Sequence, residues 1–112
     1  MTIPPSPALA NFEKMLAAGK DGALLRFSLG NEYLKASDPA RAAEHLARAV
    51  ALDPNFTAAW KLYGKALAAS GRDAEARAAF HDGIRVASAR GDKQAEKEMQ
   101  VFARRLPKTG SG

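Results

Sequence analysis

The chain has 112 residues, 46% hydrophobic and 26% charged, with a net charge of +5 and no cysteine. This length allows one domain or a short repeat array that folds without disulfides or metal. The lack of cysteine excludes disulfides, thiolate nucleophiles, zinc ribbons and iron–sulfur clusters.

Two tails enclose a chain that is otherwise predicted to be helical. Proline near the start and glycine near the end predict disorder in residues 1–7 and 107–112. Between them, apolar residues at helical spacing predict a first helix that begins at Ala8 and ends at Gly19. A second helix is predicted to follow, with Asp21 as its N-cap.

Four more helices are predicted from turn residues and apolar stripes. A break at Asp38 and Pro39 supplies an N-cap and a first-turn proline for a third helix that ends near Leu52. The fourth helix is predicted to stop at Gly71, and Asp92 to cap the sixth. Because the linkers are short, neighbouring helices are predicted to be antiparallel, which makes the fold class all-α with about six helices.

Matched glycines indicate an internal repeat. Gly30 and Gly64 lie 34 residues apart, each inside a helix-forming run. Glycine inside a helix costs roughly 1 kcal/mol relative to alanine, so the pair predicts helices that approach too closely for a side chain. The same offset relates two further pairs, Ala42 with Ala76 and Leu46 with Phe80.

The repeat resembles the tetratricopeptide pattern, a helix–turn–helix unit of the same length with Trp, Leu-Gly, Tyr, Ala, Phe and Pro at set places. The residues that carry the resemblance are Gly30, Tyr33, Ala42, Leu46, Pro54, Trp60, Tyr63, Gly64, Ala76 and Phe80. The resemblance implies helical hairpins stacked as a short right-handed α-solenoid. It divides the helical domain, 8–106, into a half repeat (8–22), two repeats (23–56 and 57–90) and a capping helix (91–106).

The resemblance also implies a binding groove. In tetratricopeptide proteins the first helix of each hairpin lines a concave surface that accepts an extended peptide or a helix of a partner. The groove residues implied here are Leu24, Phe27, Asn31, Leu34, Lys35, Lys61 and Lys65, with Met99 and Phe102 at one end. Lys61 and Lys65 lie one helical turn apart, so they favour a carboxylate or phosphate of a partner, with a solvated surface as the alternative. For Phe27 and Leu34 the alternative to a role in the groove is packing against the first helix.

No catalytic, metal or cofactor site is predicted. His45 and His81 lie in different helices without metal-ligand spacing and are predicted to be surface or helix-flank residues. The sequence holds no Gly-x-Ser-x-Gly elbow, phosphate-binding loop or dinucleotide-binding glycine motif.

The residues at five positions exclude one known ligand of the tetratricopeptide family. A subgroup binds the free carboxylate of chaperone tails through a clamp of Lys, Asn, Asn, Lys and Arg. The corresponding positions here hold Phe27, Asn31, Leu62, Asp92 and Glu96. Since only Asn31 agrees, the chaperone sequence Glu-Glu-Val-Asp is predicted not to bind.

The sequence therefore predicts a non-enzymatic scaffold for protein–protein interaction. No stretch approaches the roughly 18 apolar residues of a membrane span, and the start lacks a signal sequence, so a cytoplasmic protein is expected. Two alternatives stay open. One is binding of nucleic acid or an acidic partner through the basic C-terminal half, which lacks aromatic platforms for bases. The other is self-association, as a homodimer or as a subunit of a larger assembly.

Overall fold

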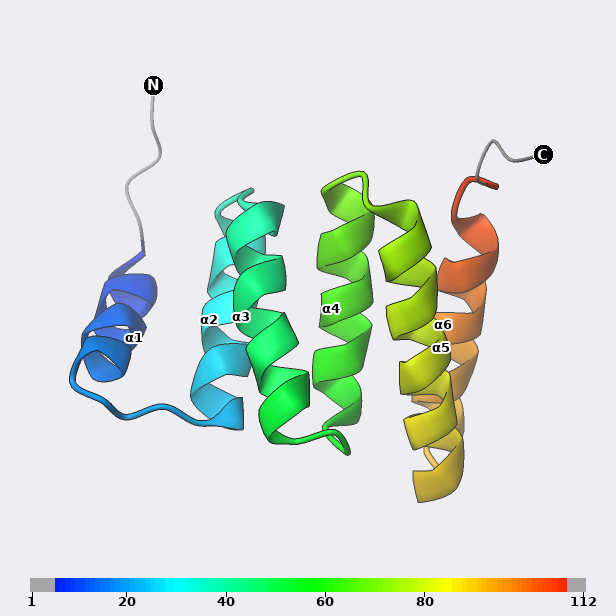
Figure 1. The fold of residues 1–112 in the computed structure, drawn as a ribbon, viewed down its shortest axis with the longest axis horizontal. Helices are drawn as coiled ribbons and strands as arrows, with labels where there is room; N and C mark the ends of the chain where they lie inside the picture. The colour runs from blue at the N-terminus through cyan, green and yellow to red at the C-terminus, as the bar shows by residue number, and fades with distance from the viewer. Residues whose placement is uncertain (1–5, 109–112) are drawn as a thin grey trace.

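The computed structural model describes residues 6–108, which form six α-helices and no strand. The helices are α1 (Pro7–Ala17), α2 (Ala23–Lys35), α3 (Pro39–Leu52), α4 (Thr57–Ala69), α5 (Asp73–Arg90) and α6 (Lys93–Arg105). They are stacked side by side as antiparallel hairpins (Figure 1). The predicted all-α fold class is confirmed.

The helices form two curved layers. Consecutive helices contact each other, and α2, α4 and α6 also contact in that order. In Figure 1, α3 lies in front of α2 and α5 in front of α6, with α4 between the two pairs. The shortest dimension of the molecule, 21 Å, matches two layers of helices about 10 Å apart with their side chains. Within the described residues α3 and α5 do not contact each other, so the face formed by α2, α4 and α6 is the concave one. We call it the even-helix face.

The beginning of α1 differs from the prediction. Residues 1–5 and 109–112 of the predicted tails lie outside the described residues. However, Ser6 and Pro7 belong to the helical domain, since Ser6 is the N-cap of α1 and Pro7 its first residue. The Ser6 hydroxyl also donates a hydrogen bond to Glu32 at 3.0 Å, which links α1 to α2. Leu9 is buried while Ala8 is exposed, so the inward face of α1 is set by Leu9 instead of Ala8.

Two of the three predicted N-cap residues cap their helices in the structure. Asp38 and Asp92 each accept a hydrogen bond at 3.1 Å from the backbone N–H three residues later, a cap that contributes about 1 kcal/mol. The prediction that Asp21 caps α2 is wrong. Gly22 occupies the N-cap without a side-chain bond, and Asp21 forms a salt bridge with Arg26 at 2.8 Å instead.

The turn inside each hairpin requires a residue in the left-handed region. After α4, which ends at Ala69, this residue is the predicted Gly71, with φ of 76°. At the corresponding place after α2 it is Ser37, with φ of 61°. Because residues with a Cβ are strained in this region, the first hairpin turn stores strain that the second does not.

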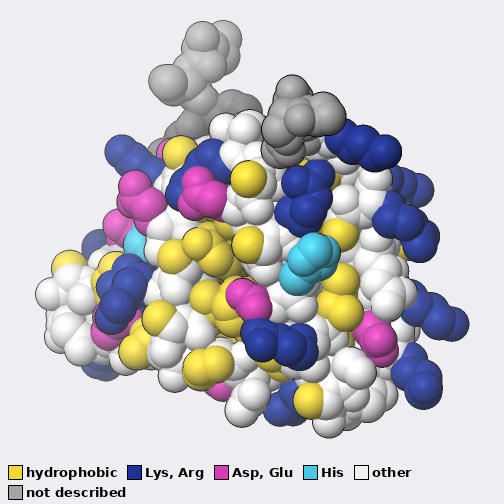
Figure 2. Space-filling view, turned by 45° about the vertical axis from the view of Figure 1, so that its right-hand side comes forward, with side chains coloured by type: hydrophobic (Ala, Val, Ile, Leu, Met, Phe, Trp, Pro, Cys, Tyr) yellow, Lys and Arg dark blue, Asp and Glu magenta, His cyan; other side chains and the backbone are white. Residues whose placement is uncertain are grey.

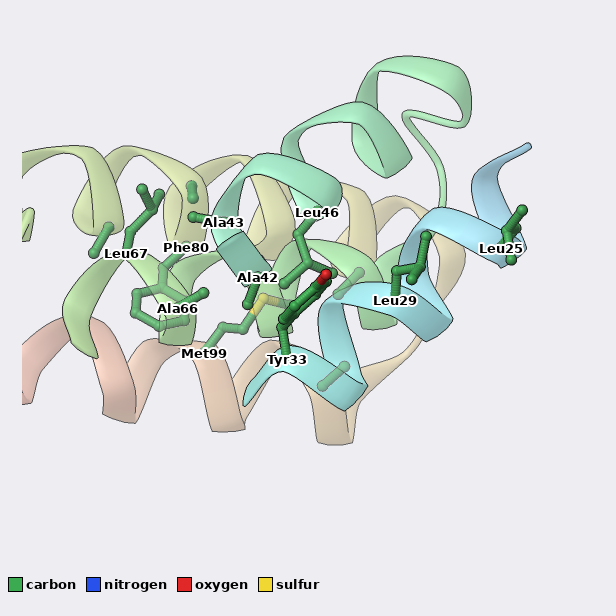
Figure 3. Close-up of a cluster of buried hydrophobic side chains, with 14 of the residues drawn as sticks. Leu25, Leu29, Tyr33, Ala42, Ala43, Leu46, Ala66, Leu67, Phe80 and Met99 are labelled. Carbon is green, nitrogen blue, oxygen red and sulfur yellow. The ribbon is translucent and has the colours of Figure 1, made fainter. Parts of the chain in front are cut away.

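The main core is a continuous cluster of apolar side chains between the two layers, and a smaller second cluster holds Ala49, Val50 and Ala59. Figure 3 shows the main core running from Leu25 at one end to Leu67 at the other. A Cβ atom on Gly30 would collide with Leu46, and one on Gly64 would lie 2.6 Å from Cδ1 of Phe80. The two matched glycines therefore allow the close helix approach that the sequence predicts.

A third glycine contact was not predicted. A Cβ atom on Gly83 of α5 would collide with Met99 of α6 and lie 2.8 Å from Cβ of Trp60 in α4. Trp60 also donates its indole N–H to the backbone oxygen of Pro54 at 2.8 Å. Gly83 thus lets α4 and α6 approach the same point of α5.

Candidate functional site

The predicted groove residues of α2 lie along one side of that helix. Leu24 is 69% exposed, which is unusual for a large apolar side chain in this chain. Phe27 is half-buried, and its ring centroid lies 4.8 Å from that of Phe56. Asn31 and Leu34 are also half-buried, and Leu34 packs against the core. Leu24 is therefore accessible to a partner, whereas Phe27 and Leu34 are partly used by the fold.

Lys35 extends this side of α2 at its C-terminal end. Its ammonium group pairs with Glu32 at 3.1 Å and its side chain remains 65% exposed. The hydrogen bond from Lys35, followed by the one from Ser6, holds the pKa of Glu32 below its usual value. Lys35 can thus reach a partner only by sharing or leaving Glu32.

The two lysines of α4 have different partners on α6. Lys61 pairs with Glu98 at 3.4 Å. Lys65 places its ammonium group 5.3 Å from the ring centroid of Phe102, a distance that allows a cation–π interaction. Both lysines therefore lie between α4 and α6, and only Lys61 has an acidic partner within the described chain.

The two predicted groove residues of α6 have different locations. Met99 has 0% exposure and fills the space beside Gly83, so the prediction that it closes the groove is wrong. Phe102 is half-buried, with its ring centroid 5.7 Å from that of Phe80. It therefore contributes an edge to the even-helix face while it packs on the core.

Two hollows separate α4 from α6 on this face. The first, of about 210 Å³, is lined mostly by polar residues, among them Lys61 and Glu98, and lies near the start of both helices; we call it the polar hollow. The second, of about 300 Å³, is mainly apolar and lies near their ends, with Lys65 and Phe102 in its lining. Both are at or below the small end of the size range of ligand pockets, so each suits a side chain better than a whole cofactor.

A charged cluster at the other end of the molecule joins α1, α2 and α3. The ring of His45 stacks on Tyr33 at 5.4 Å, and His45 Nδ1 lies 3.1 Å from a guanidinium nitrogen of Arg26. Its Nε2 lies 3.8 Å from a carboxylate oxygen of Glu13. Burial, and then the positive charge of Arg26, hold the pKa of His45 below its usual value. Of the two predicted surface or helix-flank histidines, His45 is thus half-buried on the flank of α3, while His81 is exposed.

The basic half of the chain is partly neutralised by its own acids. Arg72 pairs with Glu75, and Arg85 pairs with Asp82. Figure 2 shows Lys and Arg side chains concentrated along the right-hand edge of the molecule, on the side of the C-terminal helices. Because Lys61, Arg72 and Arg85 already have acidic partners, the C-terminal half carries less uncompensated positive charge for nucleic acid than its composition indicates.

Neither a metal-binding cluster nor a membrane-spanning helix occurs within residues 6–108. Among residues 6–108, no three His, Asp or Glu side chains are grouped so that they could hold a metal ion. No helix in that part of the chain has both the length and the apolar character needed to cross a membrane.

Stacked antiparallel hairpins with one helix of each on an inner face define the class of α-solenoid repeat proteins. The model of the tetratricopeptide repeat family matches residues 27–91. The chain belongs to the tetratricopeptide repeat family. Members of this family generally act as non-enzymatic modules for protein–protein interaction.

Two individual proteins are similar along most of the chain. The sequence is 57% identical over 98 residues to TPR repeat-containing protein PA0015 of Pseudomonas aeruginosa, an alignment that covers 88% of this chain and 93% of that protein. The structure is similar to the solution structure of protein BPP2914 from Bordetella parapertussis, with a TM-score of 0.77 and 44% identity. That comparison covers 90% of this chain and 88% of the other.

Proposed function

We propose that this chain is a non-enzymatic binding module that holds a peptide or a helix of a partner protein against the even-helix face. The observations that carry the proposal are the pair of hollows between α4 and α6 and the exposed apolar side chain of Leu24 on α2. Hollows and exposed apolar side chains on a concave face are features of sites that accept partner side chains.

Three features support this assignment over catalysis. The two histidines lie on different helices in different surroundings, since His45 is half-buried near α1 and His81 is exposed on α5, so they do not form one site. The lysine of the polar hollow is already paired with a glutamate, which occupies both charged groups. Family membership points the same way, because the family acts mainly through protein contacts.

A pair of matched variants tests the face. Among residues 6–108, the exposed large apolar side chains are those of Leu24 and Leu52, at 69% and 46%, and Leu52 ends α3 of the opposite layer. Purified tagged protein is used to capture partners from an extract, followed by mass spectrometry. Leu24→Asp should abolish retention of the specific partner, whereas Leu52→Asp should leave it unchanged.

The opposite result would overturn the proposal. If Leu52→Asp abolishes capture and Leu24→Asp does not, the partner binds the outer layer. Lys61 is a poor choice for such a test. A glutamate there would face Glu98 and destabilise the contact of α4 with α6, so lost binding would not report on the face alone.

A further inference from the structure

The apolar hollow near the ends of α4 and α6 has walls of different chemistry. Its floor is Phe80 of α5, which is 1% exposed, and its other lining residues come from the two neighbouring helices. The lining residues are Lys65, Ala68, Phe80, Phe102, Arg105 and Leu106. Four of them are apolar, and the two charged ones are cations on opposite walls, one from α4 and one from α6.

The two cations lack acidic partners within residues 6–108. Neither Lys65 nor Arg105 has a carboxylate oxygen within 4 Å there. The neighbouring Lys61 differs, because Glu98 neutralises it. The contact of Lys65 with the ring of Phe102 orients its ammonium group without cancelling its charge. The hollow therefore combines an apolar floor with uncompensated positive charge on both sides.

This combination selects a particular ligand chemistry. An apolar side chain would be buried on the floor, and carboxylates on either side of it would meet the two cations. A nucleobase fits less well, because stacking needs an open ring face. Phe80 is buried, and the ammonium group of Lys65 already lies over the ring of Phe102.

We propose that this hollow binds a segment of a partner protein in which a large apolar side chain is flanked on both sides by acidic residues. The inference rests on the proposed function and narrows its partner. Lys65 and Arg105 act as the two clamps, and the space between Ala68, Phe102 and Leu106 receives the apolar side chain.

The probe is a short peptide, acetyl-Gly-Glu-Phe-Glu-Gly-amide, titrated into isotope-labelled full-length protein and followed by NMR. Signals of Lys65, Ala68, Phe102, Arg105 and Leu106 should shift together. Two control peptides replace either both Glu by Gln or Phe by Ala, and each should bind about fivefold or more weakly. Loss of two exposed ion pairs accounts for the weaker binding of the Gln peptide, and loss of apolar burial on the floor accounts for that of the Ala peptide.

A matched pair of charge variants makes the test specific. Arg105→Glu should weaken binding of the probe about fivefold or more. Arg104→Glu makes the same change of charge one residue away, at an exposed residue outside the lining, and should alter binding less than twofold. Equal effects of the two variants would show general charge attraction and would overturn the proposal.

Other results would also overturn it. These are shifts confined to other parts of the molecule, equal binding of the Glu and Gln peptides, or a dimer in light scattering that Arg105→Glu dissociates. The last result would mean that a second copy occupies the hollow. If the probe fails while capture of a partner still depends on Leu24, this inference fails and the proposed function stands.

Discussion

Replacement of Gly64 by alanine tests whether close helix packing explains the repeat. An added Cβ would lie 2.6 Å from Cδ1 and 2.7 Å from Cζ of Phe80. Carbon atoms in contact prefer roughly 3.5–4.0 Å, so the ring or helix α5 would have to move by about 1 Å. Phe80 has little room to move, since it is 1% exposed and its ring centroid lies 5.7 Å from that of Phe102.

The expected magnitude follows from two opposing effects. Overpacking of a core costs about 1–3 kcal/mol, and contacts this short belong in the upper part of that range. Alanine restores about 1 kcal/mol of helix propensity. Gly64→Ala should therefore lower the free energy of unfolding by about 1–2 kcal/mol. In a domain of this size that corresponds to a fall in Tm of about 5–15 °C.

Urea unfolding and thermal melts measure the change, with Gly22→Ala as the matched control. Gly22 has extended backbone, with φ of 177°, and a Cβ atom there meets nothing within 4 Å. Its replacement should change stability by less than about 0.5 kcal/mol, because loss of unfolded-state freedom offsets a poorer N-cap. If Gly64→Ala is as stable as the parent protein, helix propensity outweighs packing and the explanation of the repeat by close approach is refuted.

Four further outcomes are expected. Because the pKa of His45 is held below its usual value, the unfolded chain takes up a proton more readily as pH falls below about 6.5, so the free energy of unfolding should decrease between pH 7.5 and 5.5. Urea titrations at both pH values check this, and His45→Gln should reduce the slope. Ser37→Gly should raise stability by about 0.5–1 kcal/mol by removing strain at φ of 61°, and an unchanged Tm would count against that strain. Met99→Ala should lower stability by about 2–4 kcal/mol, since the side chain is fully buried, whereas a loss under about 1 kcal/mol would indicate a surface residue. A peptide ending in Glu-Glu-Val-Asp should gain no affinity from its free terminal carboxylate, so calorimetry should give the same result with the peptide amidated at that end, and micromolar binding that depends on the terminal carboxylate would contradict the clamp argument.

The fold was predictable because its signals are local or periodic. Gly71 and Asp92 end and begin helices through contacts with residues a few places away, so short motifs were sufficient. The glycine repeat was also readable, since Gly30 and Gly64 recur at a fixed interval. Asp21 was wrongly predicted to cap α2, because an aspartate can cap a helix, but its carboxylate pairs with the nearby Arg26 instead.

The site was less predictable, because it depends on helix rotation and on contacts between distant residues. The 34-residue interval places Met99 in register with Lys65 of the groove, and Glu98 where Gly64 stands, but the structure buries Met99 against Gly83 in the core. The pair of Lys61 with Glu98 joins residues more than a full repeat apart. One signal was available: Gly83 is also a glycine inside a helix, and it marks the place where α6 must approach closely.

The two lysines of α4 illustrate how the fold divides a charged face. Like charges one turn apart repel, and a carboxylate removes that repulsion by cancelling one charge, whereas an aromatic ring only orients the other. Glu98 neutralises Lys61, so a partner carboxylate arriving there would have to displace Glu98 and leave it unpaired. Lys65 keeps its charge beside Arg105 at the apolar hollow. Under the proposed function, an acidic partner would therefore gain most of its ion-pair free energy at the ends of α4 and α6, and a partner segment on the even-helix face would be oriented by that end.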